Sequence, residues 1–86
     1  MAQYNVQILP SVIRKDLAKL PKKDVEKILV KIKSLADDPR PQLSKKLLGR
    51  EEYRLRQGKY RILYLINDDE VIVLVVKVAK RETVYR

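Results

Sequence analysis

The sequence contains no cysteine and no histidine, and these two absences remove several kinds of chemistry. Without cysteine there can be no disulfide, no thiolate nucleophile and no thiolate metal ligand. Without histidine, the chain lacks the side chain that most often moves protons near neutral pH and most often binds metals. Its only glycines, Gly49 and Gly58, exclude a glycine-rich phosphate-binding loop. We therefore expect no metal and no cofactor, and any chemistry must use lysine, arginine, tyrosine, serine or carboxylate side chains.

No stretch of apolar residues is long enough to span a membrane. The first residues, Met1–Tyr4, lack the basic and apolar regions of a signal peptide, which predicts a cytoplasmic protein. Positive charge is in excess, because 20 lysines and arginines against 11 acidic residues give a net charge of +9. That surplus favours a polyanionic partner, namely nucleic acid, an anionic membrane or an acidic protein. With 45% hydrophobic residues, the 86-residue chain should form a single globular domain, residues 1–86.

The first half of the sequence predicts one strand and two helices. Apolar and polar residues alternate over 4–8, which indicates a short strand. Ser11 can cap a helix over residues 11–20. Pro21 is tolerated in a first turn and starts a second helix, whose apolar residues follow a helical spacing over 25–36. The tight connection between two short helices predicts an antiparallel helical hairpin.

The second half of the sequence predicts three antiparallel strands. Residues 42–52 are expected to form a loop, and strands are expected over 53–57, 60–66 and 71–76. The last of these is apolar at every position and is therefore expected inside the sheet. If the N-terminal strand pairs beside it, the fold is α+β, with a four-stranded sheet and both helices on one face.

The hairpin over residues 53–64 shows two contrasting faces. Gly58 and Lys59 suit a two-residue type II′ turn, and that turn places Arg56 directly opposite Arg61. Because side chains alternate along a strand, the members of each face can be assigned from the sequence. One face carries Tyr53, Leu55, Ile62 and Tyr64, and the other carries Arg54, Arg56 and Arg61.

Two directly opposed arginines repel each other, by roughly 3 kcal/mol at ~5 Å and an effective dielectric of ~20, and by less when fully solvated. A bound polyanion would turn this repulsion into attraction, and the planar guanidinium group suits phosphate. The same pattern also fits the solvated edge of a basic protein, and these residues alone do not separate the two interpretations. For the lysines of the predicted helices, interleaved acidic residues favour a solubilising face over a phosphate-binding one.

Arg81 and Tyr85 follow the predicted inner strand and would share one face of a short helical tail. If that strand neighbours the hairpin, its end could bring Arg81 near Arg61. Such a cluster suits metal-free RNA cleavage by the 2′-hydroxyl, because guanidinium groups stabilise the doubly negative transition state. A phenol flanked by cations has a lowered pKa and could act as the base. Tyr85 could equally pack the C-terminus onto the sheet.

Two segments resemble characteristic sequences of RelE-type toxins of the RelE/ParE superfamily, namely the hairpin over 53–64 and the ending over 78–86. The length of the helix pair and the segment Lys46–Gly49 are also similar. The resemblance implies a RelE-like fold and an mRNA interferase that enters the ribosomal A site, beside 16S rRNA, and cuts the codon there. It also implies a RelB-like antitoxin that wraps the toxin in a hetero-oligomer.

Carried over by position, the resemblance assigns roles to individual residues. Arg61 and Arg81 would bind and stabilise the scissile phosphate, with Arg81 assisting the leaving group, and Tyr85 would orient or deprotonate the 2′-hydroxyl. Arg54 and Arg56 stand where many members have lysines of the active site, which shifts the role of base to Tyr85 or to water. The candidate RNA-binding residues are Lys45, Lys46, Arg50, Lys59 and Lys80.

Two other functions are compatible with the sequence. A ParE-like toxin would have the same fold but would inhibit DNA gyrase by binding, without cleavage. The combination of Arg61, Arg81 and Tyr85 favours the nuclease, because a gyrase inhibitor does not need it. A plain RNA-binding module would show salt-dependent affinity and no cleavage.

Overall fold

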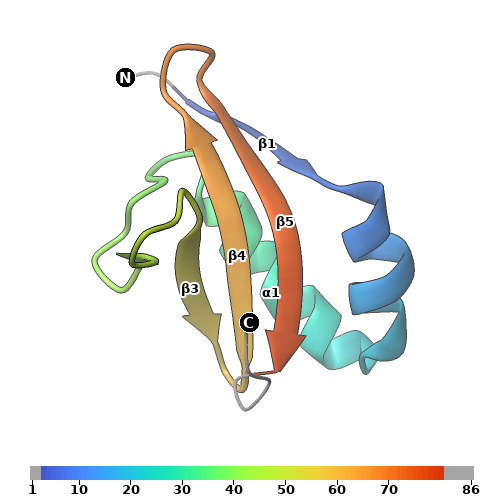
Figure 1. Ribbon diagram of the computed structural model, residues 1–86. Helices are drawn as coiled ribbons and strands as arrows, with labels where there is room; N and C mark the ends of the chain where they lie inside the picture. The colour runs from blue at the N-terminus through green and yellow to red at the C-terminus, as the bar shows by residue number, and fades with distance from the viewer. Residues whose placement is uncertain (1–2, 81–86) are drawn as a thin grey trace.

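A computed structural model describes residues 3–80, which form one five-stranded sheet with helices on one face (Figure 1). The strands are β1 (Asn5–Ile8), β2 (Lys45–Lys46), β3 (Tyr53–Gln57), β4 (Tyr60–Asn67) and β5 (Ile72–Lys80). The helical segments are a π-helical turn (Val12–Asp16), a 3₁₀ turn (Leu17–Lys19) and the helix α1 (Lys22–Ser34). The strand order is β1-β5-β4-β3-β2, with β1 parallel to β5 and every other pair antiparallel.

The predicted α+β fold is confirmed, including the pairing of the N-terminal strand beside the last one. The predicted number of four strands was wrong, because Lys45–Lys46, in the expected loop over 42–52, pairs with β3 as the short edge strand β2. The last strand is also longer than expected and extends to Lys80. It lies inside the sheet, between β1 and β4, as its apolar sequence predicted.

The first predicted helix is present, as a π-helical turn followed by a 3₁₀ turn and not as an α-helix. It ends because Leu20 precedes a proline and adopts an extended conformation, with φ −100° and ψ 152°. Pro21 then opens α1 as predicted. Within residues 3–80, no helix is long and apolar enough to span a bilayer.

The hairpin between β3 and β4 has the predicted register. Arg56 is the partner of Arg61, and Leu55 is the partner of Ile62. Gly58 has a φ of +59°, as the first central position of a type II′ turn requires. Of the non-glycine residues that the structure describes, only Val71 has a positive φ, so Lys59 also fits this turn.

The core lies between α1 and the face of the sheet that α1 covers (Figure 1). Ile28 and Ile32 of α1 are at most 1% exposed and pack against this face. Tyr64 is fully buried, its ring stacks on Tyr53 with centroids 5.8 Å apart, and its hydroxyl donates to the Pro39 carbonyl at 2.8 Å. The apolar hairpin face is therefore the inner face of the sheet, and the arginines lie on the outer face.

A β-bulge interrupts the pairing of β4 with β5 between Leu63 and Tyr64. Leu63 pairs with Lys77 and Tyr64 pairs with Val75, which leaves Val76 as the extra residue. Since one inserted residue reverses the faces of a strand, the bulge decides which side chains of β5 face outward beyond it.

Candidate nucleic-acid interface

The outer face of the sheet gathers the three arginines of the hairpin. Arg54 on β3 lies opposite Leu63 on β4, and Arg56 lies opposite Arg61. All of them face away from the buried inner row of Leu55 and Ile62, because neighbouring residues of a strand point to opposite faces. The predicted convergence of Arg54, Arg56 and Arg61 on one surface is therefore present in the fold.

Two lysines extend this set across the sheet. Lys45 on β2 is the partner of Arg54, and Lys77 on β5 is the partner of Leu63. One row across four strands therefore consists of Lys45, Arg54, Leu63 and Lys77. The next row consists of Arg56, Arg61 and Ala79. We call the five cations of these rows the cationic face: Lys45, Arg54, Arg56, Arg61 and Lys77.

The cationic face is crowded and partly shielded from water. Arg54 and Arg61 are half-buried, and the Nε atom of Arg61 is inaccessible to solvent. Leu63, in the middle of the first row, is only 3% exposed. Lys45 lies opposite Arg54 and Arg56 lies opposite Arg61, which makes two pairs of like charge. Because directly paired side chains on adjacent strands have Cβ atoms about 5 Å apart, the charges of each pair lie close together. The two cations of such a pair repel each other, and an anion bound across them would turn that repulsion into attraction.

The carboxylate of Asp16 borders the cationic face at β5. Lys77 Nζ donates to Asp16 Oδ1 at 3.2 Å, and the other oxygen of Asp16 accepts the Val78 backbone N–H at 3.0 Å. The side chain of Asp16 is 11% exposed and that of Lys77 is 51% exposed. Asp16 therefore fixes the π-helical turn to the free edge of β5 and places a negative charge beside one of the five cations.

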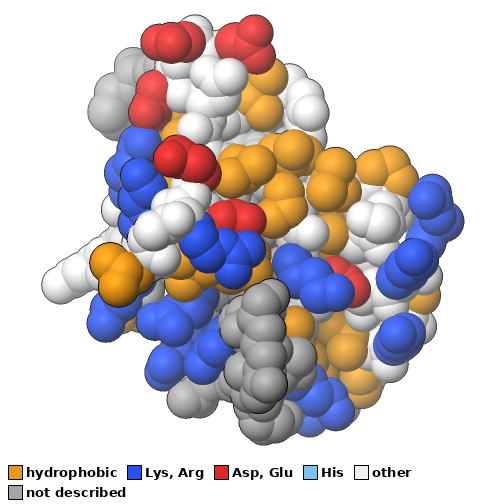
Figure 2. All heavy atoms as spheres, viewed as in Figure 1, with side chains coloured by type: hydrophobic (Ala, Val, Ile, Leu, Met, Phe, Trp, Pro, Cys, Tyr) orange, Lys and Arg blue, Asp and Glu red, His pale blue; other side chains and the backbone are white. Residues whose placement is uncertain are grey.

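Acidic side chains mark the far limit of the basic surface. Beyond the bulge, the outer face carries an open groove of about 730 Å³ with an apolar floor. Its lining includes Leu65, Ile72 and Leu74 together with Glu51, Asp68, Asp69 and Glu70. Figure 2 shows this surface from the outer side, with acidic side chains gathered toward the top, an apolar strip below them and mainly basic side chains, with a few acidic ones among them, over the lower half. A polyanion is repelled from the acidic end and attracted to the end that carries the β3–β4 turn.

Comparison with known proteins identifies the family of the chain that carries this surface. The sequence profile of the ParE toxin of the type II toxin–antitoxin system parDE matches residues 7–85. The chain belongs to the RelE/ParE toxin superfamily. It is thus the toxin of a type II toxin–antitoxin system.

Individual relatives of the toxin carry RelE names. A protein of Methanocaldococcus jannaschii named as a RelE1 toxin is 35% identical over 88 residues, which cover 98% of this chain and 97% of that protein. The RelE–RelB complex from Pyrococcus horikoshii OT3 matches with a TM-score of 0.82 at 28% identity, over 95% of this chain and 99% of that chain. The RelBE2 toxin–antitoxin complex from Mycobacterium tuberculosis matches with a TM-score of 0.81 at 28% identity, over 96% and 97%. The predicted RelE-like fold is confirmed.

Two of the predicted RNA-binding lysines lie on the other side of the toxin's sheet. Lys46 is the partner of Tyr53, and Lys80 is the partner of Tyr60. Both tyrosines belong to the inner register, so the strand alternation directs Lys46 and Lys80 away from the cationic face. Of the five lysines and arginines proposed to bind RNA, Lys45 is the one that the register places among the arginines.

Lys59 lies apart from the cationic face, and Arg50 is bound by the nearby carboxylate of Glu52. Lys59 Nζ is 5.8 Å from the centre of the Tyr60 ring, on the side of the hairpin tip that faces α1. Arg50 forms a bidentate ion pair with Glu52, with its shorter contact at 2.9 Å. The proposed RNA contact of Lys59 would therefore be separate from those of the arginines, whereas Arg50 would have to exchange its carboxylate partner for a phosphate.

Two of the predicted catalytic residues, Arg81 and Tyr85, lie outside the described residues. The condition for bringing Arg81 near Arg61 was that the last strand pairs with the hairpin, and β5 does pair with β4. Arg61 is the partner of Ala79, which precedes Arg81 by two positions in the sequence.

Three of the toxin's described tyrosines are poor candidates for a general base. A hydrogen bond to Asp24 raises the pKa of Tyr60 to about 12. A hydrogen bond to Asp68 raises the pKa of Tyr4, and burial raises the pKa of Tyr64. None of the three can supply a phenolate near neutral pH, so they hold the fold together and leave the role of base to other groups.

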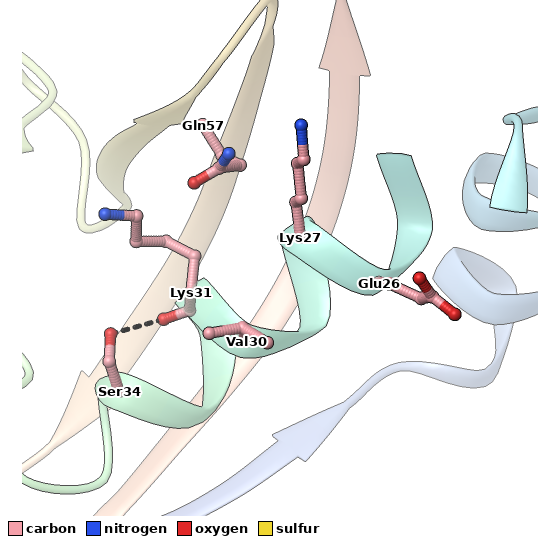
Figure 3. Close-up of a pocket in the computed structure, with 6 residues that line it drawn as sticks. All are labelled: Glu26, Lys27, Val30, Lys31, Ser34 and Gln57. Carbon is pink, nitrogen blue, oxygen red and sulfur yellow. Dashed lines mark hydrogen bonds between the residues drawn. The ribbon is translucent and has the colours of Figure 1, made fainter. Parts of the chain in front are cut away.

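A second groove, of about 370 Å³, lies on the opposite side of the toxin between α1 and the end of β3 (Figure 3). Figure 3 shows Lys27 and Lys31 extending toward β3 and Glu26 pointing away from it. Val30 is 70% exposed at the bottom of this groove. None of the residues that line it belongs to the cationic face, so the two surfaces are distinct.

Lys77 and Asp16 were not predicted from the sequence as parts of the site. Lys77 was visible as a single charge within an otherwise apolar strand. Its face depends on the bulge at Leu63, which no pattern in the sequence indicated. Asp16 is 61 positions away from Lys77 in the chain, and only the fold brings the two together.

Proposed function

We propose that the toxin is a ribosome-dependent endoribonuclease that cuts mRNA in the ribosomal A site. The cationic face is the observation that carries this proposal. A strand pair selected for stability alone would place threonine or an opposite charge at the partner of an arginine, whereas this sheet has Lys45 opposite Arg54 and Arg56 opposite Arg61. A phosphodiester bound across these pairs is the ligand that best accounts for them. The RelE names of the relatives also support a nuclease function for the cationic face.

In the proposed reaction, the 2′-oxygen of the nucleotide attacks the adjacent phosphorus and loses its proton. The bond from phosphorus to the 5′-oxygen breaks, and that oxygen takes up a proton as it leaves. The resulting product is a 2′,3′-cyclic phosphate. Arg61, with Arg54 and Arg56 beside it, stabilises the negative charge that accumulates on the phosphoryl oxygens. Guanidinium groups keep their protons at any physiological pH, so these arginines bind and polarise but do not transfer protons.

The remaining roles are assigned to residues carried over from the family resemblance. Arg81 assists the leaving 5′-oxygen by donating a hydrogen bond, while water supplies the proton that this oxygen takes up, and Tyr85 orients or deprotonates the 2′-hydroxyl. The hydroxyls of Tyr4, Tyr60 and Tyr64 are held by Asp68, Asp24 and the Pro39 carbonyl and have raised pKa values, so these three do not compete with Tyr85 for the role. Water is the alternative base. Neither step requires a metal or a cofactor.

We further propose that a RelB-like antitoxin binds this toxin in the cytoplasm and neutralises it in a hetero-oligomer. The solved relatives from Pyrococcus horikoshii and Mycobacterium tuberculosis are complexes of this kind. The net charge of +9 also favours an acidic partner when no nucleic acid is bound.

Inhibition of DNA gyrase is the second candidate, because the family profile that matches the chain is named after ParE. A gyrase inhibitor would act by binding alone. It would have no need of clustered arginines on an exposed sheet face, and their presence is the reason for preferring the nuclease.

Expression of the toxin in cells, followed by mapping of mRNA 5′ ends, separates the candidates. The proposal expects new ends within translated codons and none in untranslated messages. Intact mRNA with gyrase-linked DNA damage would support the ParE-like function, and the absence of both effects would indicate simple RNA binding. Arg61→Ala is the matched negative control, and Lys33→Ala, an exposed lysine of α1, controls for loss of one charge.

A further inference from the structure

Lys77 faces outward only because of the β-bulge. On the Tyr64 side of the bulge, Tyr64 pairs with Val75, and continuing that register would place Val76 opposite Leu63 and Lys77 opposite Ile62. Ile62 is fully buried, so a regular strand would direct Lys77 into the core. The extra residue moves Lys77 opposite Leu63, onto the outer face. Bulges of this kind commonly redirect a side chain next to a functional site.

We propose that Lys77 is a phosphate-binding residue of the toxin's RNA site, and that the RNA backbone crosses the strands along the row of Lys45, Arg54 and Lys77. This inference rests on the proposed function of the cationic face. Adjacent strands lie about 4.8 Å apart, so the row from β2 to β5 spans roughly 14 Å. Leu63 lies between Arg54 and Lys77 and contributes no competing charge or hydrogen-bonding group.

Asp16 acts as the counterion of Lys77 when RNA is absent. Their contact is 3.2 Å long, and half of the Lys77 side chain is open to solvent, so the ammonium group can exchange the carboxylate for a phosphate. Asp16 keeps a second function in either state, because its other oxygen accepts the Val78 N–H. The acidic groove at the other end of the outer face disfavours a path along the strands, which leaves the crossing row as the route for a polyanion.

The test is the salt dependence of binding to a fluorescent single-stranded octanucleotide of RNA, followed by anisotropy with the purified full-length toxin. Each phosphate contact with single-stranded nucleic acid contributes about 0.7 to the slope of log affinity against log salt. Lys77→Ala should therefore lower the slope by about 0.7 and weaken binding about fivefold at roughly 0.1 M salt. Lys77→Arg should restore most of the affinity. Lys33→Ala removes the same charge from the opposite side of the molecule and should leave the slope unchanged.

Asp16→Asn distinguishes phosphate binding from a purely structural ion pair. Asparagine keeps an oxygen for the Val78 N–H but removes the charge that competes for Lys77. The inference expects this variant to bind RNA at least as tightly as the wild type. Weakening by Asp16→Asn to the extent seen with Lys77→Ala would show a structural role and overturn it.

Two outcomes distinguish failure of the inference about Lys77 from failure of the proposed function. If Arg54→Ala lowers the slope and Lys77→Ala does not, Lys77 is not a phosphate ligand, while the function proposed for the arginines stands. If the wild-type toxin leaves mRNA on translating ribosomes uncut, the nuclease proposal fails whatever the slopes are. In that case, a Lys77-dependent slope would still establish the RNA contact itself.

Discussion

Arginine has opposite surroundings at the two ends of this small sheet. At one end, Arg40 donates from both terminal nitrogens to Asp68, at 3.2 and 2.8 Å, and from Nε to the Tyr53 hydroxyl at 3.1 Å. Its guanidinium carbon also lies 5.4 Å from the centre of the Tyr53 ring. Tyr4 donates to the same carboxylate at 2.6 Å. We call these four residues, Arg40, Asp68, Tyr4 and Tyr53, the Arg40 clamp. At the other end, Arg56 faces Arg61 across the hairpin.

The comparison shows that neighbours, and not residue type, decide what an arginine contributes. In the Arg40 clamp, the Asp68 carboxylate and the hydroxyl and ring of Tyr53 surround one cation, and Tyr4 donates to the same carboxylate, so segments that are far apart in the chain are joined. The hydrogen bond from Arg40 holds the pKa of Asp68 at about 2. On the cationic face, Lys45 lies opposite Arg54 and Arg56 lies opposite Arg61, and an anion bound across these like-charge pairs would replace repulsion with attraction. Removing the arginine should therefore affect stability at one end and activity at the other.

The largest effect is expected from Arg61→Ala. Loss of one preorganised donor to the transition state should reduce the rate of mRNA cleavage on programmed ribosomes by about 10²- to 10³-fold. Single-turnover cleavage with excess toxin measures this rate directly, and circular dichroism checks that the variant folds. A folded Arg61→Ala toxin with an unchanged rate would remove Arg61 from the proposed mechanism.

Arg40→Ala should show the reverse pattern. It loses the contacts with Asp68 and Tyr53, and thermal unfolding should move to lower temperature by roughly 4 °C, a modest shift because the ion pair is exposed. Its cleavage rate should stay close to that of the wild type. Arg40→Lys keeps the charge but cannot make the two-nitrogen contact, so its unfolding temperature should be intermediate. A large loss of cleavage without loss of stability would mean that Arg40 belongs to the functional surface.

The clamp also predicts a dependence of stability on pH. The pKa of Asp68 is about 2 in the folded protein and 3.8 in its ordinary environment. Its contribution is therefore complete above about pH 4 and is lost as the pH falls toward 2, because protonation then favours the unfolded chain. Urea unfolding at several pH values in this window should show the loss. Asp68→Asn should flatten the profile there, and an equally steep profile in that variant would assign the effect to other carboxylates.

Local rules predicted the part of the site that lies within one hairpin. Gly58 fixes the turn, and the strict alternation of the strands then fixes the pairing of Arg56 with Arg61. The same rules could not predict the β-bulge, because the extra residue at Val76 depends on how β5 packs, and no sequence pattern marks its position. Contacts between distant segments, such as the ion pair of Arg40 with Asp68, also could not be predicted from the sequence. The sequence therefore predicted the arginines of the cationic face but neither Lys77 nor its ion-pair partner Asp16.

The short strand β2 was missed for a related reason. Lys45–Lys46 is too short and too polar to show the alternation of a strand, and it is ordered by its pairing with β3. The helix predicted over 11–20 is present but irregular, because Asp16 turns toward the edge of β5 and Leu20 extends before Pro21. In both cases tertiary contacts override a weak local preference.

The smallest effect is expected at Lys45, where one substitution tests the difference between the cationic face and the Arg40 clamp. Lys45→Glu places a carboxylate opposite Arg54 and so creates on the cationic face the kind of pair that Arg40 has in the clamp. The free energy of unfolding should rise by about 0.2–1 kcal/mol, the usual gain for an opposite-charge cross-strand pair, as measured by urea unfolding. RNA binding should weaken at the same time. Lys46→Glu, one position along and on the other face, is the matched control and should change neither quantity in this way. If Lys45→Glu left both stability and RNA affinity unchanged, the like-charge pair would be an ordinary solvated edge and not a surface kept for an anion.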